Sequence, residues 1–135
     1  MPITWDDVII SQKPQTKRFS DPIVSVYLSR LSFNAAVCSL FDNIYQYEWV
    51  NVKQGIENNR IIKLGFELST KNSPHSLHIL QKIFRGKKVE GLNLYSKPLI
   101  ERYFTEVNDE GSKVRRFAVE KVNANTFAIN LHREY

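Results

Sequence analysis

The 135-residue sequence has one cysteine, no long apolar run and no clustered glycine, and each of these absences excludes a class of protein. The single cysteine, Cys38, excludes an intramolecular disulfide and fits a reducing compartment. No apolar run approaches the roughly 18 residues that span a bilayer, and the N-terminus lacks the basic start and apolar region of a signal peptide. We therefore expect a cytoplasmic protein that does not contact a membrane.

Groups that carry catalysis or hold metals are also scarce. The five glycines are scattered singly, so the chain has no glycine-rich phosphate loop. His75 and His78 are three residues apart, but no Cys or acidic cluster joins them to complete a metal site. Cys38 has apolar neighbours, which oppose the lowered pKa that a nucleophile requires. The sequence therefore predicts a binding protein that has no catalytic activity and uses neither a metal nor a cofactor.

Positive charge is the most informative property that the sequence does have. Nineteen Lys and Arg against fourteen Asp and Glu give a net charge of +5 and a pI near 9.4, above the value of about 9 that is typical of nucleic-acid-binding domains. Seven cations fall in two acid-free segments, "KIFRGKK" and "KVRR", and six of them are candidate ligands: Lys82, Arg85, Lys87, Lys88, Arg115 and Arg116. We expect these side chains to bind nucleic-acid phosphates.

Aromatic residues alternate in the segment "YQYEW". If this segment is extended, Tyr45, Tyr47 and Trp49 share one face of a strand. Bases stack on such rings for about 1 to 3 kcal/mol each, so these three residues are candidates for base stacking. The alternative is that the rings are buried where parts of the protein pack together.

Two junctions between a strand and a helix organise the chain. In "LSFNAAVCSLF" Asn34 is a preferred N-cap, and the apolar residues after it have the spacing of one helix face. In "LNLYSKPLIERYF" Ser96 caps a second helix with the same apolar spacing. Alternating apolar residues predict hairpins before and after each helix. The sequence thus predicts an α+β fold of mostly antiparallel strands with two short helices, in which residues 21–68 and 76–132 are pseudo-repeated ββαββ units.

We expect residues 1–20 to form an N-terminal arm and residues 21–135 a single compact domain. The segment 74–85 also has a helix signature, with Ser73 as a cap and Gly86 as a stop. We predict a strand there, because the duplicated order of elements then holds throughout. Twelve residues are expected to form the core: Phe33, Val37, Phe41, Val50, Ile62, Leu64, Phe66, Leu99, Tyr103, Phe117, Phe127 and Ile129.

The run "RLSFNAAVCSLFDNIYQYEWVNVKQGIENNRIIKLGFEL", residues 30–68, resembles the swapped-hairpin DNA-binding domains of AbrB-type transition regulators and MazE-type antitoxins. The resemblance lies in the order of strand, short helix and hairpin. In it, Arg30 matches the arginine before the first strand and Asn34 matches the start of the helix. Those domains grip DNA as dimers through basic residues near strand ends, so the resemblance implies DNA binding and adds Arg30 to the expected phosphate-binding residues.

These observations leave two classes of function open. We expect nucleic-acid binding, to DNA more than to RNA, by a monomer or homodimer with a role in transcription regulation. The alternative is a protein-interaction module, such as an inhibitor or assembly factor, whose Lys and Arg side chains meet an acidic partner surface. The sequence does not separate the two classes, because both require exposed cations.

Overall fold

A computed structural model describes Thr4 and the residues 21–104 and 114–135, so the predicted arm lies outside the described residues apart from Thr4. The described residues contain nine strands: β1 (Ile23–Val26), β2 (Arg30–Phe33), β3 (Trp49–Glu57), β4 (Arg60–Ser69), β5 (Leu77–His78), β6 (Leu80–Phe84), β7 (Lys87–Tyr95), β8 (Arg115–Asn123) and β9 (Thr126–Glu134). The helices are α1 (Ala35–Cys38), the 3-10 turn η1 (Ile44–Gln46) and α2 (Lys97–Tyr103).

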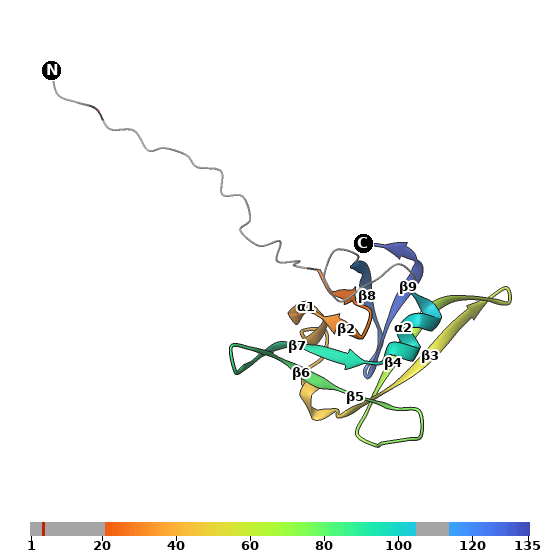
Figure 1. Cartoon of the computed structure of the whole chain (residues 1–135), viewed down its shortest axis with the longest axis horizontal. Coiled ribbons are helices and arrows are strands. Elements are labelled where there is room, and N and C mark those ends of the chain that lie inside the picture. The colour runs from red at the N-terminus through yellow and green to blue at the C-terminus, as the bar shows by residue number, and fades with distance from the viewer. Residues whose placement is uncertain (1–3, 5–20, 105–113) are drawn as a thin grey trace.

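All nine strands belong to one antiparallel sheet that curls into a nearly closed, barrel-like body (Figure 1). The order across the sheet is β5-β3-β4-β9-β8-β1-β2-β7-β6. Hairpins from the first and second parts of the chain therefore alternate around it. The predicted α+β fold class is wrong, because the described chain is mostly strand and α1 and α2 have only four and seven residues.

The prediction is wrong because it assumes that the strands of each ββαββ unit pair with one another. Instead, β1 pairs with β8 and β2 pairs with β7. The hairpin β1–β2 from the first part of the chain therefore lies between two strands from the second part. A short helix buries little apolar surface, whereas a closing sheet buries one whole face of every strand. The division into repeats over residues 21–68 and 76–132 stays a prediction.

Both predicted helix caps are present. The Asn34 Oδ1 atom accepts a hydrogen bond from the Val37 N–H at 3.3 Å, and the Ser96 hydroxyl oxygen accepts one from the Leu99 N–H at 3.3 Å. Asn34 Oδ1 also accepts from the Ile23 N–H at 3.1 Å. This cap therefore ties the start of β1 to the start of α1.

Phenylalanine rings from opposite walls fill the interior of the sheet. Phe66 of β4 and Phe127 of β9 are direct cross-strand neighbours, and their stacked rings have centroids 5.3 Å apart. Phe33 of β2 meets these two rings edge-on at 5.4 and 5.2 Å. Of the twelve residues predicted to form the core, nine are buried, and three are half-buried: Ile62, Leu99 and Tyr103.

A narrow seam brings the two edges of the sheet together. β5 pairs with β3 over only two residues, and the Ile79 N–H donates to the Glu48 carbonyl oxygen at 2.8 Å. Ile79 alone separates β5 from β6, which lies at the opposite end of the strand order. The prediction of strand for the segment 74–85 is thus confirmed by β5 and β6.

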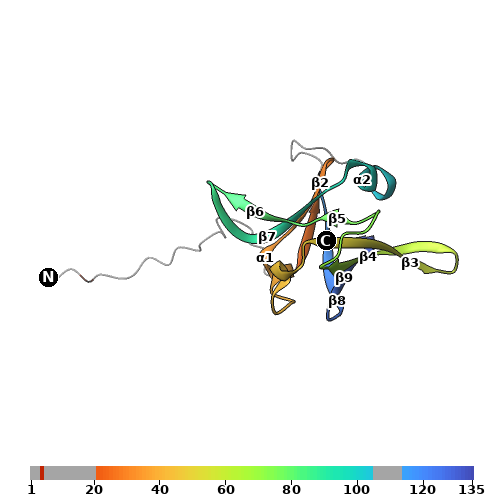
Figure 2. The same ribbon diagram turned by 90° about the horizontal axis from the view of Figure 1, so that it is seen from below.

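Two long hairpins extend from the body to opposite sides (Figures 1 and 2). The β3–β4 hairpin turns at Asn58 and Asn59, and the β6–β7 hairpin turns at Arg85 and Gly86. All four turn residues have positive φ, between 51° and 76°, as in type I′ hairpin turns. No helix in residues 21–104 and 114–135 has the length and apolar character needed to cross a membrane.

Candidate functional site

A groove of about 350 Å³ lies on the outer face of the sheet, where β2, β7 and β6 run side by side. On β2 and β7 its lining residues alternate with core residues, as expected for the second face of a sheet. A smaller hollow of about 250 Å³ shares Ile83, Asn93 and Tyr95 with it. The groove has no acidic residue in its lining, which consists of Arg30, Ser32, Lys82, Ile83, Phe84, Val89, Asn93 and Tyr95.

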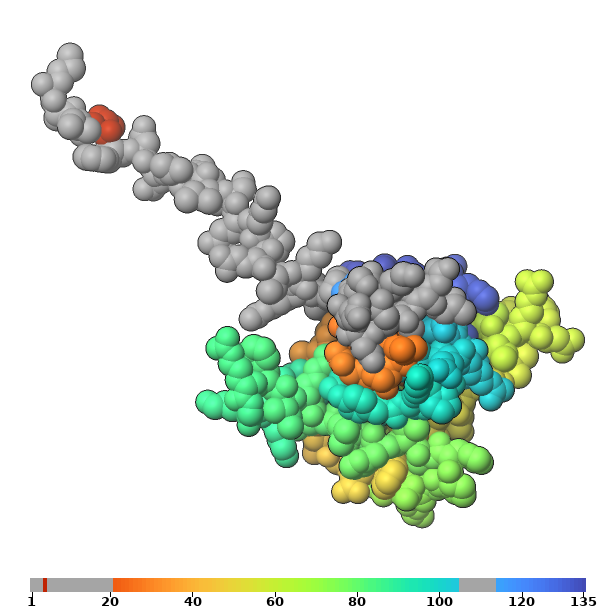
Figure 3. Space-filling model, in the orientation of Figure 1, coloured from red at the N-terminus to blue at the C-terminus, as the bar shows by residue number. Residues whose placement is uncertain are grey.

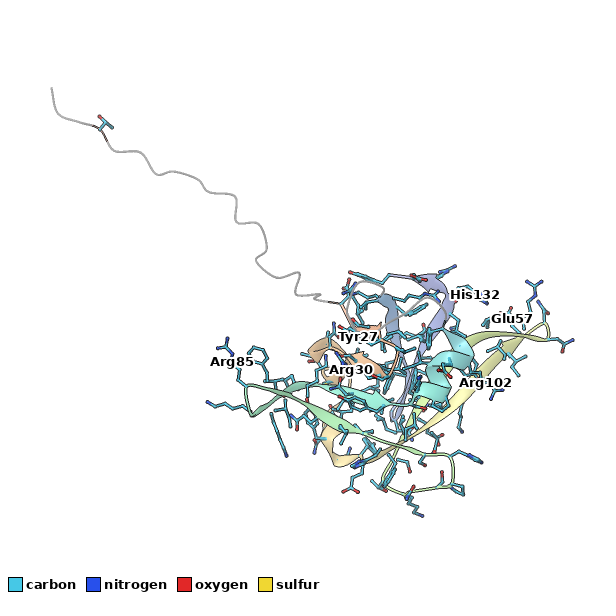
Figure 4. All side chains as sticks on the ribbon, in the orientation of Figure 1. Tyr27, Arg30, Glu57, Arg85, Arg102 and His132 are labelled. Carbon is cyan, nitrogen blue, oxygen red and sulfur yellow. The ribbon has the colours of Figure 1, made fainter. Side chains whose placement is uncertain are left out.

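Arg30 enters the groove from the start of β2. Its guanidinium carbon lies 4.1 Å from the ring centroid of Tyr27, which is the cation–π arrangement, and the two side chains lie together in Figure 4. The ring covers one face of the planar guanidinium, while the N–H groups around its edge stay available to an anion. Arg30 is therefore held in position before any ligand binds.

Lys82 reaches the groove from β6 across Gly91 of β7. A Cβ atom on Gly91 would lie 2.5 Å from Lys82 Cδ and 3.0 Å from the Phe33 carbonyl oxygen, so any other residue here would displace the lysine stem. Burial lowers the pKa of Lys82, Arg30 lowers it further by charge repulsion, and Cys38 acts in the opposite direction. Arg30 and Lys82 thus both line a groove whose lining has no carboxylate.

Replacing Gly91 by Ala is expected to lower the free energy of unfolding by about 1 to 3 kcal/mol, because Gly91 has a φ of 135° and the added methyl group would lie 3.0 Å from the Phe33 carbonyl oxygen. Urea unfolding measures the loss. Gly65→Ala is the control, since its nearest contact would be 3.8 Å away and its φ lies outside the left-handed range. Equal losses in the two variants would contradict the steric argument.

The tip of the β6–β7 hairpin carries three more of the predicted cations. Arg85 lies at the turn, at the end of the hairpin in Figure 4, with its guanidinium carbon 5.2 Å from the ring centroid of Phe84. Lys87 and Lys88 follow it and are exposed. The hairpin stands out from the body in the space-filling view (Figure 3), so these cations are reachable from several sides.

The two predicted cations of β8 have different surroundings. Arg115 forms an ion pair with Glu134, and its guanidinium carbon lies 5.3 Å from the centroid of the Phe117 ring. Arg116 lies opposite Ser25 of β1, in a row that continues through Ser32 to the groove. Of the predicted cations, Arg30 and Lys82 line the groove, the hairpin tip holds three, and Arg115 is already paired with an acid.

The three candidate stacking residues do not share a strand face, because η1 interrupts the segment. The Tyr45 hydroxyl donates to Glu90 at 2.5 Å, and burial together with the Glu90 carboxylate raises the pKa of Tyr45. Tyr47 packs against the core, and the Trp49 ring lies 5.0 Å from the His78 ring. Their stacking role stays a prediction, and these contacts favour the packing alternative.

Sequence reasoning missed the aromatic rings that do lie in the groove. Phe84 and Tyr95 are 61% and 50% exposed. An apolar residue in an alternating strand is normally assigned to the core, so neither ring was singled out. The available signal was the position of Phe84 inside the acid-free segment "KIFRGKK".

The part of the chain that the structure describes gives little support for metal binding or nucleophilic catalysis. That part contains no group of three or more His, Cys, Asp or Glu side chains arranged to hold a metal ion. Burial raises the pKa of the Cys38 thiol, which opposes its use as a nucleophile. The groove is therefore the strongest candidate for a functional surface.

Comparisons with known proteins give no relative. No protein-family model, curated protein or solved structure matches the chain. The resemblance of residues 30–68 to AbrB-type and MazE-type domains therefore stays a hypothesis. Any assignment of function depends on the groove and its surroundings.

Proposed function

We propose that this protein binds nucleic acid and catalyses no reaction, and that the binding surface is the groove over β2, β7 and β6 together with the β6–β7 hairpin tip. One observation carries the proposal: Arg30 and Lys82, whose charges repel, both line a groove whose lining contains no acid. An anion placed between them would remove this repulsion. A polymer of phosphates could then reach the cations of the hairpin tip as well.

Some cations elsewhere on the surface are paired with acids. Within residues 21–104 and 114–135, several cations on other strands are matched by acids, in the pairs Lys53–Glu67 at 3.1 Å, Lys63–Glu120 at 2.7 Å and Arg115–Glu134. In the same residues, no ion pair involves Arg30, Lys82, Arg85, Lys87 or Lys88. This uncompensated charge supports a polyanionic partner.

A second candidate function is binding to an acidic protein surface. The exposed apolar side chains beside these cations, Ile83 and Phe84, support it, because such residues often anchor protein interfaces. A role in regulating transcription would need DNA as the ligand, so the identity of the polyanion decides between these functions.

Fluorescence anisotropy with labelled duplex DNA, single-stranded DNA and RNA at several salt concentrations tests the proposal. Contacts with about five phosphates should give a slope of log affinity against log salt near −4 to −5 on duplex DNA and near −3.5 on single strands. Lys87→Glu should weaken binding and make the slope shallower by about 1.

Arg60→Glu is the matched control for this measurement, because it makes the same charge reversal at the tip of the other long hairpin. We expect its affinity to stay close to that of the unaltered protein. Failure to bind any of the three nucleic acids at low salt would overturn the proposal and leave the acidic protein partner as the leading hypothesis.

A further inference from the structure

The proposed function does not say whether the nucleic acid is a single strand or a duplex. The residues that line the groove favour one of the two. Resting on that function, we infer that the ligand is a single strand, whose unpaired bases stack on Phe84 and Tyr95 while Arg30 and Lys82 hold its phosphates.

The first argument is the pairing of rings and cations in the sheet. Tyr95 lies directly opposite Arg30 in the β2–β7 ladder, and Phe84 lies directly opposite Lys87 in the β6–β7 ladder. Each exposed ring therefore has a cation as its cross-strand neighbour. Proteins that bind single strands use this combination, in which a ring takes the base and a cation takes the phosphate.

The second argument is the exposure of the rings. Phe84 and Tyr95 both line the groove, although large aromatic side chains gain most from being buried. In a duplex the base faces are stacked on one another, so a duplex could use the cations but not the rings. A single strand presents free base faces and uses both.

The groove lining also includes a polar side chain two residues before Tyr95 on β7. Asn93 of β7 lies opposite Ser32 of β2, and both line the groove. The buried Asn93 Oδ1 atom accepts no hydrogen bond from any residue that the structure describes. Turning this amide toward the edge of a base would therefore cost Oδ1 no existing bond.

The test uses the full chain and one labelled oligonucleotide of mixed sequence, prepared as single-stranded DNA, as single-stranded RNA and as duplex DNA. We expect at least one single strand to bind about tenfold more tightly than the duplex. Phe84→Ala and Tyr95→Ala should each weaken single-strand binding about 5- to 100-fold and change duplex binding less than about twofold.

Ile56→Ala is the matched control, because Ile56 is 64% exposed near the tip of the other long hairpin and should not affect binding. Phe84→Trp gives a second readout: its added fluorescence should be quenched by the single strand and not by the duplex. If the duplex binds as well as the single strands and the alanine variants bind normally, this inference fails while the proposed function stands. If no nucleic acid binds, both fail.

Discussion

Replacing Phe127 by Ala is expected to lower the free energy of unfolding by about 3 to 5 kcal/mol. Phe127 is only 1% exposed and lies where the phenylalanine rings of the core converge. Its ring contacts those of Phe33, Phe41 and Phe66, with centroids 5.2, 5.8 and 5.3 Å away. The lost ring would leave a cavity between β2 and β9 that the surrounding sheet can close only in part.

Urea unfolding followed by circular dichroism measures this effect. Val122→Ala on the neighbouring strand β8 is the control, because Val122 is 57% exposed and its truncation should change stability by less than about 0.5 kcal/mol. Phe127→Leu should fall between the two, since it keeps part of the buried volume. A midpoint for Phe127→Ala equal to that of Val122→Ala would show that the ring is not in the core.

The second large effect concerns binding. Combining Arg30→Gln with Lys82→Met should weaken nucleic-acid binding about 100-fold or more. Hydrogen bonds to charged groups are worth about 1.5 to 3 kcal/mol each, and every 1.4 kcal/mol is about a factor of ten in affinity. Anisotropy at one fixed low salt concentration measures the loss, with Arg60→Gln as the control that removes a cation from the opposite hairpin.

Removing the charge of Lys82 should weaken binding without lowering the stability of the fold. The pKa of Lys82 is lowered mainly by burial, so at neutral pH its charge costs folding stability, and this cost fades as the pH rises through the lowered pKa toward the ordinary lysine value. Lys82→Met removes the cost, and its melting temperature at pH 7 should be unchanged or higher. A lowered melting temperature that accounts for the loss of binding would contradict a role in ligand contact.

Local chemistry explains which parts of the fold could be predicted from the sequence. The caps at Asn34 and Ser96 depend on neighbours within three residues, and strands are indicated by alternating apolar and polar residues. Which strands pair depends on residues that are far apart in the sequence: Ile23 lies opposite Ala118, and Phe33 lies opposite Leu92. No local pattern carries that information, so the fold class was wrong although most strands were expected.

The same distinction applies to the candidate site. The basic turn at Arg85 was identified because charge is clustered along the chain. The rings of Phe84 and Tyr95 were missed because alternation marks a strand without saying which apolar residues face outward once the sheet closes. Tyr45 was assigned to an extended face, but the 3-10 turn η1 places its hydroxyl against Glu90.

The narrow seam has a consequence for how the molecule can move. A two-residue strand and one neighbouring hydrogen bond join β3 to the segment before β6, and the phenylalanine core is anchored on the longer ladder between β4 and β9. Opening the seam would therefore break few backbone hydrogen bonds and leave that ladder intact. The β6–β7 hairpin would stay attached to the body through its four-residue ladder with β2 and the buried side chains of Leu92 and Leu94. The groove could then adjust its width to a ligand without global unfolding.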